Sequence, residues 1–210
     1  MEQKDLEVIM KAFQAYYPLG MPDIKNGFDK IREVIGAKIR EEHILLERWF
    51  VLVTELKQIT THQVYNLYYT QFPNLMVTID QVISIGNIKV NQRFILCFSL
   101  LCTYFTYFYD YHHRTELIVK GKGGLSMKGI YFLNNDIFEE LKIDIPLEKI
   151  NEIIKKHFPE YHYLYHYDLM MHNIVGGYPI GYNFQYDDQK KYSIYQYLFD
   201  LDEVESRICL

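Results

Sequence analysis

The sequence predicts an α+β protein, and three observations support this class. Apolar residues recur at helical spacing through the first half, an uncharged aromatic run lies near the middle, and the second half alternates β-rich segments with glycine turns. We expect a mainly helical N-terminal half around a buried central helix at about residues 88–112, followed by a C-terminal half with two β-hairpins and two short helices.

The change in character near Arg114 divides the chain into a helical part, residues 1–113, and an α+β part, residues 114–210. No proline- or serine-rich linker separates the two parts. We therefore expect them to share one core instead of moving as separate domains.

The central helix is predicted from residues 94–109, which contain no charged side chain. At 1.5 Å per residue this run would form a helix of about 24 Å that is apolar on every side, which is typical of a helix enclosed by its neighbours. A membrane-spanning helix needs about 20 apolar residues. The shorter run favours a buried helix over a membrane anchor, and the anchor is kept as a rival interpretation.

Three amphipathic helices are predicted before the central one. Residues 4–17, 24–35 and 37–59 each place apolar side chains at the i, i+3, i+4 and i+7 positions of one helix face. Gly36 predicts a break between the second and third, because glycine costs about 1 kcal/mol relative to alanine within a helix.

Two further short helices are predicted before the central run. Thr60 and Gln63 have the spacing of a capping box, which would begin a helix over residues 60–70. Pro73 is suited to the first position of another helix, over residues 73–83.

The C-terminal half contains β-rich runs joined by turn residues. Residues 115–133 predict a first hairpin, residues 134–141 and 146–158 predict the two short helices, and residues 182–197 predict a second hairpin. Residues 161–167 alternate between tyrosine and other residues, which predicts a strand with aromatic side chains on one face.

The composition argues against one class of function. With 210 residues, 49% hydrophobic and 23% charged, the chain can bury a core, and its net charge of −5 argues against generic nucleic-acid binding. The 20 tyrosines are the unusual feature, since tyrosine is enriched at protein-binding surfaces. An AT-rich genome offers an alternative reason for the same bias.

Cysteine usage and the first residues predict a cytoplasmic protein. Cys97, Cys102 and Cys209 are few and odd in number, as expected of reduced, buried thiols. The start, MEQKDLEVIMKAF, lacks the basic and apolar regions of a signal peptide.

Clustered histidines and aspartates suggest a metal site. Imidazole with carboxylate suits a divalent transition metal, which would make the protein a metal-dependent hydrolase such as a nuclease or phosphoesterase. The His-Glu-x-x-His signature is absent, so the same histidines also fit a hydrogen-bonded aromatic layer. The candidate ligands are Asp110, His112, His113, His162, His166 and Asp168.

A second candidate is anion binding at the tip of the first hairpin. Lys120, Lys122 and Lys128 lie in or beside a glycine-rich turn that could contact phosphate. The P-loop pattern is absent, so a basic, flexible hairpin tip is the favoured interpretation.

No motif specifies a chemistry, and we assign no catalytic residue and no cofactor. The leading hypothesis is a non-enzymatic protein that binds another protein, either an immunity or antitoxin-type inhibitor or a subunit of a larger assembly such as a phage connector. The sequence leaves the partner and the oligomeric state open. The expected contacts lie on the aromatic C-terminal part, at Tyr182, Tyr186, Tyr192 and Tyr195.

Overall fold

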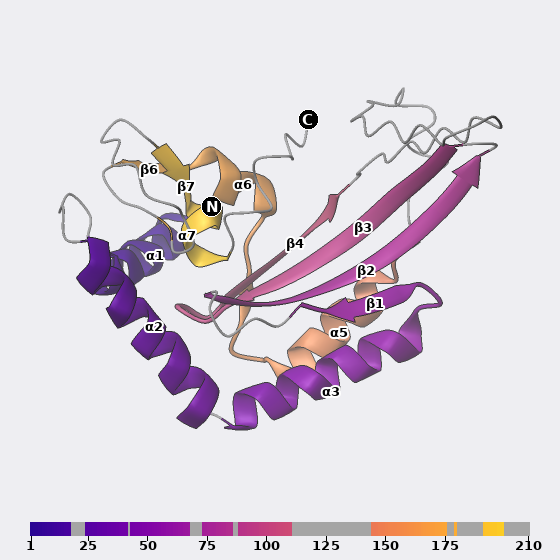
Figure 1. Ribbon diagram of the computed structural model, residues 1–210, viewed down its shortest axis with the longest axis horizontal. Helices are drawn as coiled ribbons and strands as arrows, with labels where there is room; N and C mark the ends of the chain where they lie inside the picture. The colour runs from indigo at the N-terminus through magenta and orange to yellow at the C-terminus, as the bar shows by residue number, and fades with distance from the viewer. Residues whose placement is uncertain are drawn as a thin grey trace, which may run out of the picture.

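A computed structural model describes residues 1–17, 24–41, 43–67, 73–85, 88–110, 144–175, 179 and 191–199 (Figure 1). It confirms the α+β class. Within the described residues, helices accompany a five-stranded sheet of order β1-β2-β3-β4-β5 and a two-stranded sheet of β6 and β7.

The predicted N-terminal helices are confirmed as α1 (Gln3–Tyr16), α2 (Ile24–Glu41) and α3 (His43–Ile59). The predicted break at Gly36 is wrong, because α2 continues through that residue. The cost of one glycine is small, and the fully buried Ile31 and Ile35 anchor the helix just before it.

The large sheet consists of β1 (Gln63–Asn66), β2 (Asn74–Ile85), β3 (Ile88–Ser99), β4 (Tyr104–Asp110) and β5 (His162–Tyr163). Strands β1 to β4 pair antiparallel, and β5 joins the edge of β4 in parallel. Strands β2 and β3 form a long hairpin in Figure 1.

The predicted buried helix at about residues 88–112 is wrong. This run forms β3 and β4, with Phe98 opposite Phe105 across the turn between them. The inference of burial was right, since Phe94, Ile95 and Phe98 are fully buried. Helices cover both faces of this part of the sheet, so its strands lack the polar–apolar alternation that would have distinguished them from a buried helix.

The helices predicted over residues 60–70 and 73–83 are also wrong, because these segments supply β1 and β2. The hydroxyl of Thr60 accepts a hydrogen bond from the amide of His62 at 3.1 Å. The threonine therefore closes a tight turn into β1 instead of capping a helix.

In the C-terminal half, α5 (Leu147–His157) confirms the helix predicted over residues 146–158. The strand predicted over residues 161–167 is confined to β5, after which the chain forms α6 (His166–Met171).

The second arm predicted for the second hairpin, residues 192–197, is a strand only at its start and continues as a helix. β6 (Asn173–Val175) pairs antiparallel with β7 (Lys191–Ser193), and α7 (Ile194–Leu198) follows at once. A capping box between Ser193 and Gln196 begins that helix. The first hairpin, the helix predicted over residues 134–141, the first arm of the second hairpin and the predicted boundary at 113/114 lie outside the described residues.

The core is built on both faces of the sheet. On one face, Phe98 contacts Trp49 of α3 at 5.6 Å and Phe158, just after α5, at 4.9 Å between ring centroids. On the other face, the Tyr104 hydroxyl donates to Asp5 of α1 at 3.0 Å. Figure 1 shows α3 and α5 along the sheet, while α1, α6 and α7 gather toward one end of it.

Candidate protein-binding surface

Five tyrosines from β4, β5 and the start of α6 lie next to one another, and we call this surface the tyrosine ribbon. Its members are Tyr107, Tyr109, Tyr163, Tyr165 and Tyr167. The ring of Tyr163 stacks on Tyr107, with centroids 4.7 Å apart, and Tyr165 lies 6.2 Å from Tyr167. Phe94 lies beside them on the neighbouring strand β3, 5.5 Å from Tyr107 and 5.4 Å from Tyr109 between ring centroids.

Strand pairing explains why these residues share a surface. Alternate residues of β4 point to the same face, so Phe105, Tyr107 and Tyr109 lie in one row. β5 pairs in parallel with Tyr163 opposite Phe105, held by hydrogen bonds from the amides of His162 and Leu164 to Thr103 and Phe105 at 3.0 and 2.9 Å. Residues far apart in the sequence thus form one aromatic row.

The outer part of the ribbon is exposed. The exposed fractions are 41% for Tyr163, 59% for Tyr165 and 53% for Tyr167. The preceding tyrosine of the alternation, Tyr161, is buried against Phe98. The ribbon therefore has a half-buried part, Tyr107 and Tyr109, and an exposed rim, Tyr163, Tyr165 and Tyr167.

Burial and neighbouring charges raise the pKa of two phenols of the ribbon, Tyr163 and Tyr109. Burial is the main cause for both Tyr163 and Tyr109, and the neighbouring Tyr107 contributes in each case. Carboxylates add to the effect, Asp168 on the pKa of Tyr163 and Asp144 on that of Tyr109. The two phenols are therefore neutral hydrogen-bonding groups at physiological pH, in the field of two carboxylates.

The structure separates the two predicted histidine ligands that it describes. His162 lies exposed on β5, whereas His166 is buried on α6. The His166 ring stacks on Phe108 with centroids 3.8 Å apart and meets the edge of Tyr195 at 4.7 Å. His166 therefore belongs to an aromatic layer, which was the alternative to a metal site in the sequence analysis.

The predicted aspartate ligands also have other positions. The Asp168 carboxylate accepts a hydrogen bond from the Met1 amino group at 2.5 Å. Asp110 stands opposite Arg93 in the register of β3 and β4. Within the described ranges, no three His, Cys, Asp or Glu residues are grouped so that they could hold a metal ion. The other two predicted ligands, His112 and His113, lie outside those ranges.

Of the predicted protein-binding tyrosines, Tyr192 and Tyr195 are core residues. Tyr195 stacks on Phe199 at 5.3 Å, and its hydroxyl lies 3.8 Å from the Cys97 sulfur. Neither belongs to an exposed face. Three exposed tyrosines, Tyr163, Tyr165 and Tyr167, were instead indicated by the alternation of residues 161–167. The residues Tyr182, Tyr186, Lys120, Lys122 and Lys128 lie outside the described part of the chain.

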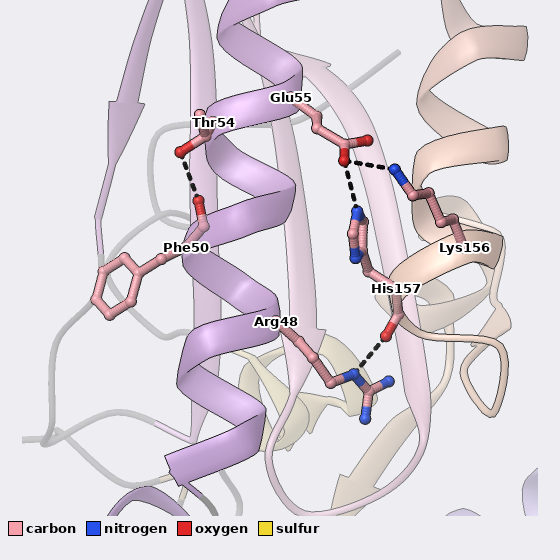
Figure 2. Close-up of polar contacts among 6 residues, drawn as sticks. All are labelled: Arg48, Phe50, Thr54, Glu55, Lys156 and His157. Atoms are coloured by element: carbon pink, nitrogen blue, oxygen red, sulfur yellow. Dashed lines mark hydrogen bonds and ion pairs between the residues drawn. The ribbon is translucent and has the colours of Figure 1, made fainter.

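A cluster of polar side chains joins α3 to the end of α5 (Figure 2), and we call it the α3–α5 clasp. Glu55 accepts hydrogen bonds from Lys156 Nζ at 2.6 Å and from the His157 ring at 3.0 Å. These two bonds hold the pKa of Glu55 below its usual value. The charges compensate one another, which is typical of a contact that holds two helices together.

Arg48 forms the other half of the clasp. Its Nε donates to the backbone oxygen of His157 at 2.5 Å, and its terminal nitrogen binds both Glu160 oxygens at 2.7 and 2.9 Å. The guanidinium lies 4.5 Å from the centre of the Phe158 ring. In Figure 2 these side chains converge between the helices, while Phe50 points away from them.

The described cysteines do not form a reactive site. Cys97 and Cys102 are buried and unbridged. Burial raises the pKa of the Cys102 thiol to about 11, so this sulfur is not a thiolate at neutral pH.

Among the described helices, none combines the length and apolar character required to cross a membrane. The run proposed as an anchor, residues 94–109, forms strands. Comparisons of the chain with known protein families, with curated proteins and with solved structures each find no match.

Proposed function

We propose that this protein works by binding another protein through the tyrosine ribbon. The observation that carries the proposal is the exposure of Tyr163, Tyr165 and Tyr167, with Tyr163 held in place by its stack on the half-buried Tyr107. Tyrosine has few rotatable bonds, so an exposed row of tyrosines can bury a large area at low entropic cost and still offer hydroxyls for hydrogen bonds.

An exposed methionine extends the ribbon along α6. Tyr167 and Met171 are one helical turn apart, and Met171 is 58% exposed. Methionine adapts its shape to a partner, which makes it common at binding surfaces. The apolar character of the surface thus continues beyond the tyrosines.

The proposed role takes one of two forms. An immunity or antitoxin-type inhibitor would form a small complex of fixed stoichiometry that abolishes the partner's activity. A subunit of a larger assembly, such as a phage connector, would form a multimeric particle. The mass of the purified complex and the activity of the partner within it distinguish the two forms.

The alternative of a metal-dependent hydrolase gains no supporting observation. His162 and His166 occupy different environments, and Asp168 binds the Met1 amino group. That alternative depends on His112 and His113, outside the described residues.

The test is a double variant, Tyr165→Ala with Tyr167→Ala, compared with Tyr65→Ala as a matched control. Tyr65 is 41% exposed, as Tyr163 is, but it lies on β1 at the other edge of the sheet. A partner captured by the wild-type protein is purified and titrated against each variant. The double variant is expected to lose at least ~30-fold in affinity, the effect of one hot-spot residue, and Tyr65→Ala less than ~3-fold.

Both variants change exposed side chains, so their unfolding midpoints should remain close to that of the wild-type protein. Equal affinity of the double variant and the wild-type protein for the purified partner would exclude the ribbon as the interface. The corresponding experiment at Tyr192 and Tyr195 would not be informative, because truncating these core residues would destabilise the fold.

A further inference from the structure

The carboxylates near the tyrosine ribbon indicate the chemistry of its partner. Asp168, in α6, is close enough to Tyr163 to influence it electrostatically, and Asp144, just before α5, does the same to Tyr109. Tyr109 and Tyr163 are connected through Phe94 and Tyr107 by successive ring contacts of 4.7–5.5 Å. Asp168 also directly follows Tyr167 along α6, so a negative charge accompanies the exposed rim of the ribbon as well as its Tyr109 end.

Part of this negative charge is available to a partner. Asp144 is exposed and makes no ion pair with any other described residue. Asp168 is partly compensated, since its Oδ2 binds the Met1 amino group, and its side chain is 32% exposed. By contrast, the charge of Glu160 is already neutralised by its ion pair with Arg48.

An arginine side chain combines the properties that such a surface would recognise. Its planar guanidinium stacks on aromatic faces and also offers paired donors to a carboxylate. A lysine ammonium lacks the planar fork, so it satisfies the ring and the carboxylate less well at the same time. The net charge of −5 also attracts basic partners over a longer range.

We propose that the tyrosine ribbon binds an arginine-bearing basic segment of its partner protein, with guanidinium groups stacked on the exposed rings of Tyr163, Tyr165 and Tyr167 and bonded to Asp144 and Asp168. This inference rests on the proposed function, because it specifies the partner that the same surface selects.

The test uses the full chain and synthetic peptides of alternating arginine and glycine. Peptides with lysine or with uncharged citrulline in place of arginine serve as comparisons, and binding is measured by calorimetry at physiological salt. The arginine peptide is expected to bind about 5-fold more tightly than the lysine peptide, the scale of one exposed cation–π contact. The citrulline peptide, which keeps the shape without the charge, should not bind measurably.

Variants separate a specific site from general attraction between opposite charges. Asp144→Asn is expected to weaken binding of the arginine peptide about 5-fold, and Tyr165→Ala with Tyr167→Ala by at least as much. Glu33→Gln removes the same charge from the exposed side of α2 and should change affinity less than about 2-fold. Equal losses at Asp144 and Glu33, or equal binding of the arginine and citrulline peptides, would overturn the inference.

The two proposals can fail separately. A natural partner that depends on Tyr165 and Tyr167 but is not displaced by the arginine peptide would refute the arginine specificity and leave the interface standing. A natural partner whose binding ignores both tyrosines would refute the proposed function itself.

Discussion

Tyr163 on β5 stacks on Tyr107 of β4, with ring centroids 4.7 Å apart and ring planes at 28°. β5 has only two residues, so this stack and two backbone hydrogen bonds fasten the edge of the sheet. The contact holds the rings of Tyr163 and Tyr107 in place before a partner binds. Rings that are already fixed lose little side-chain entropy on binding, which favours affinity.

Alkaline pH is expected to destabilise the protein through its half-buried and buried tyrosines. Burial raises the pKa of Tyr163 and Tyr109, and burial with a hydrogen bond to Asp5 raises that of Tyr104 to about 12. The unfolded state therefore releases these protons first, near pH 10. The contribution of these tyrosines to the free energy of unfolding should be constant below about pH 10 and should fall as the pH rises toward 12. Denaturant titrations across this range, followed by phenolate absorbance, measure the effect.

The variant Tyr104→Phe separates one contribution from the rest. It removes the hydrogen bond to Asp5, which should lower the free energy of unfolding by about 1 kcal/mol near neutral pH. It should also make the free energy of unfolding fall less steeply as the pH rises above about 10. Tyr65→Phe, at an exposed position, is the control. Parallel pH profiles for wild type and Tyr104→Phe would contradict the assignment.

Phe98 is expected to be among the most sensitive positions of the core. It is fully buried, and its ring contacts Trp49, Phe105, Phe158 and Tyr161 at centroid distances of 4.9–5.6 Å. Phe98→Ala should lower the free energy of unfolding by about 3–5 kcal/mol through lost contacts and the cavity left behind. Urea denaturation followed by the fluorescence of the single tryptophan, Trp49, measures this loss.

The control for Phe98 is Phe50→Ala, because Phe50 is 48% exposed on α3. Its effect should remain within about 0.5 kcal/mol. A loss at Phe98 as small as the loss at Phe50 would show that the core does not depend on this aromatic cluster.

The sequence predicted helices well where one face of the helix is exposed to solvent. In α3, Trp49, Leu52 and Leu56 are buried while Phe50, Val51 and Thr54 are exposed, so helical periodicity is visible. The same reasoning failed at β3 and β4. Leu96 and Cys97 point to opposite faces of the sheet, yet both are fully buried, because helices lie on both sides.

Turn chemistry accounts for a second failure. The link between β3 and β4 reads Leu100-Leu101-Cys102-Thr103 and contains none of the residues that usually mark a turn. Its geometry is fixed by other contacts, since the Leu100 amide donates to Pro73 at 2.7 Å and the Leu101 amide to the Ser99 hydroxyl at 3.2 Å. The contact of Leu100 with Pro73 depends on the tertiary fold and cannot be inferred from local sequence.

The candidate site could be predicted only in part from the sequence. Alternation at residues 161–167 predicted an aromatic face, and three of its tyrosines are exposed. The stacking of Tyr163 on Tyr107 could not be predicted, because it requires the parallel pairing of β5 with β4.

Replacing Arg48 by lysine should weaken the attachment of α3 to α5. Arginine binds the His157 oxygen and the Glu160 carboxylate while covering the Phe158 ring, and lysine cannot make all three contacts at once. We expect Arg48→Lys to lower the free energy of unfolding by about 1–2 kcal/mol. Glu160→Gln, which removes only the exposed ion pair, should cost less than about 1 kcal/mol. Equal effects in thermal denaturation would mean that the ion pair alone carries the contact.

Glu55→Gln should change how stability depends on acid. Hydrogen bonds from Lys156 and His157 lower the pKa of Glu55 in the folded state, so the carboxylate stabilises the fold above the ordinary glutamate pKa of 4.5. That contribution is lost as the pH falls below 4.5 through the folded-state value. The variant should therefore be less stable than the wild type at neutral pH, and the difference should shrink in acid. Glu47→Gln, at an exposed position of the same helix without an ion pair to any described residue, should show no such convergence. Denaturant midpoints that remain equally far apart for wild type and Glu55→Gln from neutral pH to below about pH 4 would show that the glutamate does not act through its charge.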